Sequence, residues 1–166
     1  MKSRLKTVII NWHGPFRSLE DITPEQKGNG LYFLWGKTKG QKNHRFQYIG
    51  ITEQNFTDRF KDPNHRCHEL RFPESSIWLG HIHYPSRYKR NLLELGENCL
   101  CHFAAPDKNK NKLYQPRKPG CIISQWCTQE GIPRLRRPSL PDYMPEMLWW
   151  DTERWRTGNM KVWGLD

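Results

Sequence analysis

An arginine and a glutamate in this chain have the chemistry that phosphodiester hydrolysis requires. That reaction needs a polarised water, a cation beside the charge that develops on phosphorus, and stabilisation of the leaving oxygen. Arg59 is always charged and can contact two phosphate oxygens at once. A single carboxylate can hold Mg²⁺, because that ion keeps several waters and takes oxygens from its phosphate substrate. Glu97 is our candidate ligand, and Glu94 is a rival three residues earlier on nearly the same helix face.

The net charge favours a polyanionic partner. Lys and Arg number 27 and Asp and Glu 17 among 166 residues, which gives +10 and points to nucleic acid or an anionic surface. The excess lies in four windows, 36–45, 87–90, 105–120 and 134–137, and the rest of the chain is net negative. We interpret these windows as phosphate contacts, which position a nucleic acid without reading its sequence. The candidate contacts are Lys37, Lys39, Lys42, Arg45, Arg87, Lys89, Arg90, Lys108, Lys110, Lys112, Arg117, Lys118, Arg134, Arg136 and Arg137.

The composition indicates one folded domain. A chain of 166 residues has room for one domain of ordinary size. Hydrophobic residues make up 36%, but aromatics reach 13%, which favours a packed core over disorder. We find neither the roughly 20 apolar residues of a membrane span nor a signal-peptide pattern, so we expect a soluble, cytoplasmic protein with no membrane partner.

The five cysteines are an odd number and lack the dense spacing of a disulfide scaffold, which indicates reduced thiols. Cys99 and Cys101 are two apart on a predicted helix, so they point to different faces, and no CxxC repeat follows. We therefore interpret the cysteines as buried structural residues rather than zinc ligands.

Three strands are predicted from hydrophobic patterns. Residues 31–35 and 46–51 are aromatic and β-branched runs on either side of a polar, basic stretch, which predicts an antiparallel hairpin with a long loop. Residues 77–84 alternate with a period of two, which predicts a third strand. A β-branched run at 7–10 belongs to a lead-in that we expect to pack on the sheet. Residues 105–140 are rich in proline and are expected to form surface loops.

Helical spacing of apolar residues occurs in three places. A short helix is predicted around Phe56, and Pro63 ends it. Residues 86–104 carry the buried stripe of an amphipathic helix. A last helix is predicted between Pro145 and Gly158.

Two triplets identify a family resemblance. Residues 30–32 read Gly-Leu-Tyr in the first predicted strand, residues 48–50 read Tyr-Ile-Gly in the second, and Arg59 follows nine residues later. In this order and context they resemble the GIY-YIG nuclease family. A Leu replaces the usual Ile of the first triplet, and 15 residues separate the triplets, somewhat more than is usual in the family. Downstream, a run similar to the family's ending favours the later of the two glutamates: Glu97, Leu100, Phe103, Pro106 and Asn109.

The resemblance implies a small α/β (α+β) domain with a central, mainly antiparallel, three-stranded sheet flanked by helices. We expect residues 30–109 to form the nuclease core. Residues 1–29 are expected to pack on it as an N-terminal extension. Residues 110–166 are expected to complete the same compact domain as a basic, Trp-rich C-terminal extension.

The resemblance also implies a metal-dependent endonuclease that hydrolyses phosphodiester bonds in DNA, with RNA left open as a substrate. Mg²⁺ or Mn²⁺ would bind Glu97, and Arg59 would hold the scissile phosphate. Tyr32 would take part in activating the water, which requires nearby positive charge because the pKa of a phenol is about 10. Tyr48 would orient water or phosphate.

Two further residues are predicted to support the site. His65 would assist as a proton carrier or a phosphate donor, with His68 as the alternative histidine, and Asn109 would brace the site. His81 and His83 lie on one face of the third predicted strand, and a metal or phosphate role for that pair is left open.

Two other functions are compatible with the same residues. The first is a catalytically inactive protein that keeps the GIY-YIG scaffold to bind nucleic acid or to regulate. The second is a protein-interaction domain whose charge gives solubility alone. A homodimer is also left open, because the chain has little room for a separate DNA-binding domain.

Overall fold

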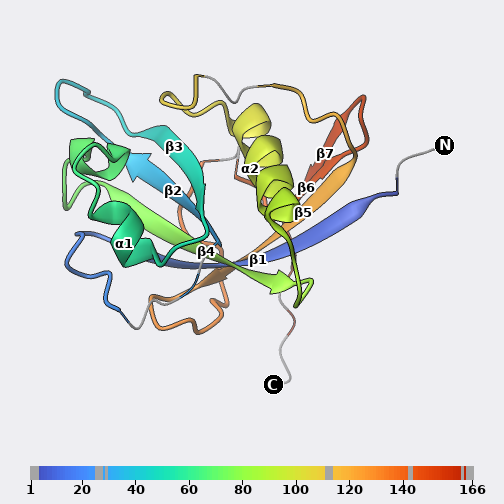
Figure 1. The fold of residues 1–166 in the computed structure, drawn as a ribbon, viewed down its shortest axis with the longest axis horizontal. Coiled ribbons are helices and arrows are strands. Elements are labelled where there is room, and N and C mark those ends of the chain that lie inside the picture. Colours follow the sequence, from blue (N-terminus) through green and yellow to red (C-terminus); the bar gives the residue numbers. More distant parts are fainter. Residues whose placement is uncertain are drawn as a thin grey trace.

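One curled sheet organises the chain (Figure 1). A computed structural model describes residues 4–24, 28, 30–110, 114–141, 144–161 and 163. The sheet has seven strands in the order β3-β2-β4-β1-β5-β6-β7. β1 and β5 run parallel, and every other neighbouring pair is antiparallel. The strands are β1 (Lys6–Phe16), β2 (Gly30–Gly36), β3 (Arg45–Thr52), β4 (Ser76–Tyr84), β5 (Gly120–Cys127), β6 (Met147–Trp150) and β7 (Trp155–Gly158).

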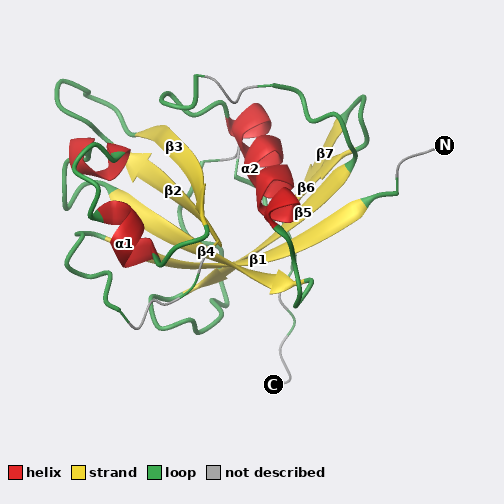
Figure 2. Cartoon of the chain, viewed as in Figure 1, coloured by secondary structure: helices red, strands yellow, loops and turns green. Residues whose placement is uncertain are grey.

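In the part of the chain that the structure describes, two α-helices and one 3-10 helix pack on this sheet (Figure 2). α1 (Phe56–Phe60) follows β3, η1 (Arg66–Glu69) precedes β4, and α2 (Arg90–Ala104) follows β4. The buried residues of α2 share one core cluster with the sheet, and those of α1 and η1 share another. Within the described ranges, no helix is long and apolar enough to cross a membrane.

β2 separates the two clusters because both of its faces are buried. Leu31 and Phe33 pack in the cluster that includes α2. Tyr32 and Leu34 alternate with them and pack in the cluster that includes α1 and η1. The continuous apolar sequence of β2 is therefore that of a strand covered on both sides. Its alternation directs the Tyr32 side chain toward α1.

The predicted three-stranded sheet flanked by helices is wrong. The three predicted strands are present as the neighbours β3, β2 and β4, but four more strands extend the same sheet. β1 is no lead-in: it spans 11 residues and pairs with β4 on one side and β5 on the other. The sheet is therefore built from both predicted extensions as well as from the predicted core.

The predictions for the second half of the chain fail in two places. β5 lies within the stretch predicted as surface loops, where Ile122, Ser124 and Trp126 face the core in alternation. The polar Ser124 interrupts the apolar pattern, but it is buried because its Oγ accepts a hydrogen bond from Trp12 Nε1 at 3.0 Å. The predicted last helix is instead the β6–β7 hairpin, since residues 147–150 alternate between half-buried and buried.

The other predicted elements are confirmed. β2, β3 and β4 match the three predicted strands, and α1 ends before Pro63 as expected. α2 begins at Arg90 rather than at Ser86, with Lys89 as its N-terminal boundary. Local patterns of period two and 3.6 were sufficient for these elements.

The glycines of the two triplets sit where a side chain would not fit. A Cβ on Gly30 would lie 2.0 Å from the carbonyl oxygen of Gly80 on the neighbouring strand β4. A Cβ on Gly50 would lie 2.5 Å from the hydroxyl oxygen of Tyr32. The first glycine therefore permits close strand pairing, and the second leaves space for the tyrosine hydroxyl.

We expect Gly30→Ala to lower the free energy of unfolding by about 1–3 kcal/mol, because the backbone of β2 or β4 must move to admit the methyl group. The measurement is urea denaturation followed by circular dichroism. Gly158→Ala is the matched control: it also lies in a strand, and the nearest atom to its Cβ would be Met147 Cε at 3.5 Å. Equal stability of the two variants would contradict the close-approach explanation.

Candidate functional site

Tyr32, Arg59 and His65 meet at one buried hydroxyl group. The Tyr32 side chain is fully buried, and its hydroxyl oxygen lies 2.8 Å from His65 Nε2. Arg59 Nε donates a hydrogen bond to the same oxygen at 3.3 Å. α1 supplies Arg59, and His65 is the residue that caps η1. Three residues predicted from the sequence are thus brought together by three different elements.

The protonation state of His65 follows from its second nitrogen. The backbone N–H of Cys67 donates to His65 Nδ1 at 3.1 Å, so Nδ1 carries no proton. Burial, and next the charge of Arg59, lower the pKa of His65 to about 4. At neutral pH the ring is therefore neutral with its proton on Nε2. His65 donates that proton to Tyr32 in a hydrogen bond.

The Tyr32 oxygen consequently accepts two hydrogen bonds, one of them from a cation. Its own proton is not used in either of these two hydrogen bonds. Burial raises the pKa of Tyr32 above that of an ordinary phenol, the nearby Tyr48 raises it further, and the hydrogen bond from Arg59 opposes both. Tyr32 is therefore a neutral phenol at physiological pH.

Tyr48 extends this cluster to the protein surface. Its ring centroid lies 6.0 Å from that of Tyr32 and 6.1 Å from that of His65. Tyr48 is half-buried and lines two adjoining depressions, of about 240 Å³ and about 670 Å³. We call their union the tyrosine groove. Its lining residues include Gln41, Tyr48, Arg59, Asp62, His65, Arg66, Asp107, Lys108, Asn109 and Lys110.

Cations predominate in the tyrosine groove, but carboxylates already hold some of them. Arg66 and Lys108 lie on the two sides of Glu69, at 2.7 Å and 3.0 Å. The hydrogen bond from Arg66, with Lys108, lowers the pKa of Glu69 below its usual value. Glu69 therefore fixes these two cations at the rim of the groove.

Asn109 braces the site in a way that the sequence did not reveal. Its side chain is 3% exposed and pairs with the outer edge of β3. Asn109 Oδ1 accepts from the Ile49 N–H at 2.8 Å, and Nδ2 donates to the Ile49 carbonyl at 2.7 Å. The Lys108 N–H adds a bond to the Gln47 carbonyl oxygen at 2.9 Å. Asn109 thus supports the strand that carries Tyr48.

Glu97 lies buried on α2, with 2% of its surface exposed. Its negative charge contributes to raising the pKa of Tyr32, so the two groups interact electrostatically. Glu97 is not among the residues that line the tyrosine groove. One carboxylate beside phosphate oxygens and waters is a donor set that suits Mg²⁺. Among the described residues, no group of three or more His, Cys, Asp or Glu side chains could hold a metal.

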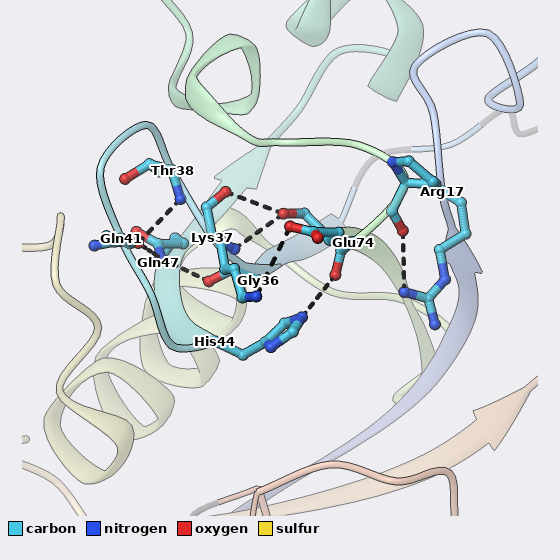
Figure 3. A network of polar contacts seen from close by, with 10 residues as sticks. Arg17, Gly36, Lys37, Thr38, Gln41, His44, Gln47 and Glu74 are labelled. Carbon is cyan, nitrogen blue, oxygen red and sulfur yellow. Dashed lines mark hydrogen bonds and ion pairs between the residues drawn. The ribbon is translucent and has the colours of Figure 1, made fainter.

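A polar network anchors the basic β2–β3 loop, 37–44, beside the groove (Figure 3). Gln47 Nε2 donates to the Gly36 carbonyl at 2.8 Å and to Gln41 Oε1 at 2.7 Å. His44 Nε2 donates to the Glu74 carbonyl at 2.9 Å. Lys37, Lys39 and Lys42 therefore lie on a loop that is fixed to the segment before β4, and Arg45, the fourth cation of window 36–45, begins β3.

The remaining predicted phosphate contacts fall into different environments. Arg134 donates to the carbonyls of Cys127 and Gly14, and its guanidinium lies over the Trp78 ring, so its hydrogen bonds are internal. Arg137 likewise donates to carbonyls of the loop that it closes. Lys112 lies outside the described residues. Arg136 is exposed on the same loop as Arg134 and Arg137. The others are exposed at the end of the molecule where β4 leads to α2: Arg87, Lys89, Arg90, Arg117 and Lys118.

The histidine alternatives are distinguished by position. His68 is exposed, and its Nε2 donates to the Asp62 carbonyl at 3.0 Å, whereas His65 contacts Tyr32. His81 packs against His13 with ring centroids 4.6 Å apart, and burial lowers its pKa to about 4. Neither His81 nor His83 lines the tyrosine groove.

Cys67 and Glu69 are site residues that sequence analysis did not select. Cys67 sets the tautomer of His65 through its backbone, so its side-chain type gave no signal. Glu69 acts through contacts to Arg66 and Lys108, of which the second is distant in sequence. The i,i+3 spacing of Arg66 and Glu69 was the one available signal.

Comparison with models of protein families, with curated proteins and with solved structures found no match. The assignment of a function therefore depends on the residues and their geometry.

His65 should make stability depend on pH. Its pKa is about 4 in the folded protein and 6.5 in the unfolded chain, so the unfolded state takes up the proton first as pH falls. The free energy of unfolding should be highest above about pH 6.5 and should decline toward about pH 4. In His65→Asn this decline should be smaller, with the remainder due to His81 and His13, whose pKa values burial also lowers. Urea denaturation across this range measures it.

The exposed His83→Asn is the control, and its pH dependence should match that of the wild type. An equal decline in His65→Asn and in the wild type would contradict the assignment of a neutral His65.

Proposed function

We propose that this chain is a metal-dependent endonuclease of GIY-YIG type that hydrolyses phosphodiester bonds in DNA, and that it acts in the cytoplasm. The observation that carries the proposal is the Tyr32 hydroxyl, which accepts hydrogen bonds from Arg59 and His65 beside a cation-lined groove. The five free cysteines are compatible with a reducing compartment.

Arg59 has two tasks in the proposed reaction. Its Nε–H is committed to Tyr32, while the side chain also lines the tyrosine groove. The terminal nitrogens of the guanidinium are then left for the scissile phosphate, whose developing charge they stabilise. Arg59 thereby couples the position of the phosphate to that of the tyrosine oxygen.

Tyr32 and Tyr48 act on the attacking water. A neutral Tyr32 orients the water through its remaining proton. The two hydrogen bonds that Arg59 and His65 donate fix the position of the Tyr32 oxygen. His65 is a positioning residue, because its Nε2 already carries a proton and cannot accept the one on Tyr32. Mg²⁺ or Mn²⁺ on Glu97 would supply Lewis-acid activation of the phosphate and the water.

A second candidate function is a catalytically inactive nucleic-acid-binding protein. The observation that favours it is the burial of Glu97, which is 2% exposed as a residue. A metal ion reaches such a group only if the cover over it opens. The two candidates predict the same binding surface but differ in whether the bound strand is cut.

Cleavage of DNA tests the proposal. In Mg²⁺ or Mn²⁺ the wild type should cut plasmid DNA, and Arg59→Ala, Glu97→Gln and Tyr32→Phe should each reduce the rate by about 100-fold or more, since each removes a group that acts in the transition state. Gel assays give the rates, and anisotropy with labelled duplex should show that binding is retained.

Lys61→Ala is the matched control for Arg59→Ala. Lys61 adjoins α1, and its ammonium pairs with Asp58 rather than with Tyr32. This variant should cleave at the rate of the wild type. DNA binding by the wild type without cleavage in either metal would replace the nuclease with the inactive binding protein.

A further inference from the structure

We propose that a second surface, distant from the tyrosine groove, binds a single-stranded flank of the nucleic acid. This inference rests on the proposed function, because it assumes a nucleic-acid substrate. The surface lies where β1 begins and where β4 leads into α2. In Figure 1 the start of β1 is on the right, and α1, which carries Arg59, is on the left. We call it the distal basic surface.

Two depressions form the distal basic surface. The larger, of about 730 Å³, and the smaller, of about 510 Å³, share Lys6 and Asn91, so they are continuous. None of the described residues that line the larger depression is acidic. Glu94 lines the smaller one, but it already accepts a hydrogen bond from Arg90 at 2.9 Å. The cations of the surface are Arg4, Lys6, Arg87, Lys89, Arg117 and Lys118.

Within the described residues, no carboxylate neutralises these cations, since none of the six forms an ion pair there. The tyrosine groove differs, since Arg66 and Lys108 there share Glu69. Uncompensated positive charge therefore accumulates at the distal end of the molecule, where it attracts a polyanion.

Exposed aromatic rings accompany the charge. Tyr84 is 54% exposed and lines the larger depression, and Tyr114 is 77% exposed and lines the smaller one. Tyr88 is half-buried and packs against the core cluster that includes α2, which gives it a structural role. Tyrosine rings stack on unpaired bases, whose faces are hidden in a duplex. Rings and cations on one surface thus favour a single strand over a duplex, whose backbone would engage the cations alone.

The separation of the two surfaces fits one continuous substrate. Tyr32 is paired with Leu79 on β4, and Tyr84 is the fifth residue beyond Leu79 on that strand. At about 3.3 Å per residue, Tyr84 lies about 17 Å along the strand from the level of Tyr32. This distance equals about five base steps of B-form DNA. A strand cut at the tyrosine groove would therefore reach the distal basic surface with a flank of about five nucleotides or more.

The test measures binding alone, without divalent metal, in the Tyr32→Phe background so that no strand is cut. Fluorescence anisotropy with labelled oligothymidylate and with labelled duplex gives the two affinities. Tyr84→Leu and Tyr114→Leu should each weaken single-strand binding about fivefold or more and leave duplex binding unchanged, because a leucine cannot stack on a base. Tyr84→Phe and Tyr114→Phe, which keep the ring, should bind as the parent does.

Salt dependence tests the cations. Arg87→Ala/Lys89→Ala should reduce the slope of log affinity against log salt by about 1.4 for the single strand, about 0.7 for each lost phosphate contact. Arg154→Ala/Lys161→Ala is the charge-matched control, because both residues are exposed and lie outside the two depressions. That control should leave the slope unchanged.

Three results would overturn the inference. The first is an unchanged affinity of the leucine variants for the single strand. The second is an equal loss of affinity for single strand and duplex. The third is that the protein binds vesicles of anionic lipid in a manner that depends on Tyr84 and does not bind oligothymidylate. Single-strand binding that requires the rings supports it, even if no cleavage is found. In that case the proposed nuclease activity fails and the distal basic surface stands.

Discussion

The hydrogen-bonding needs of the buried Tyr32 hydroxyl determine how the rest of the site is arranged. A phenol oxygen that is buried in the folded protein has to find its partners there, since an unpaired one costs about 1–3 kcal/mol. His65 and Arg59 provide them, and Arg59 is carried by α1, whose Phe56 and Phe60 are buried. Phe60 packs on the rings of Tyr32 and His65, with centroids 5.1 Å away in each case. The apolar layer under α1 therefore determines where the polar groups lie.

Much of the region around this site was predictable, because its elements are local. A hydrophobic periodicity within a few residues predicts each of these elements: the β2–β3 hairpin, α1, β4 and α2. β5 was not predictable in this way, because its partner β1 is more than 100 residues away and the pairing is parallel. Ser124 is tolerated in the core owing to Trp12, a contact that no local pattern contains. The β6–β7 hairpin was mistaken for a helix since its apolar residues satisfy both periods.

The candidate site was likewise predictable only in part. The triplets placed Tyr32 and Tyr48 on paired strands, and the structure brings Arg59 and His65 to them. The burial of Glu97 was not predictable, because it depends on how α2 lies against the sheet. The separation of the cations into two surfaces was not predictable either. Glu69 pairs with cations of the tyrosine groove, whereas the cations of the distal basic surface have no such partner among the described residues. Charge counted along the sequence does not show which carboxylates lie beside which cations in the fold.

The pairing of Asn109 with Ile49 has a consequence for how this molecule can associate with others. β3 is an edge strand, and edge strands with free N–H and C=O groups recruit further strands. The Asn109 amide occupies both groups of Ile49, and the Lys108 N–H occupies the Gln47 carbonyl. A foreign strand therefore finds no ladder to extend beside Tyr48. The β3 edge, which lies nearest the groove, is therefore closed to the addition of another strand, while the groove itself stays accessible. The other edge of the sheet is β7, at the opposite end of the strand order.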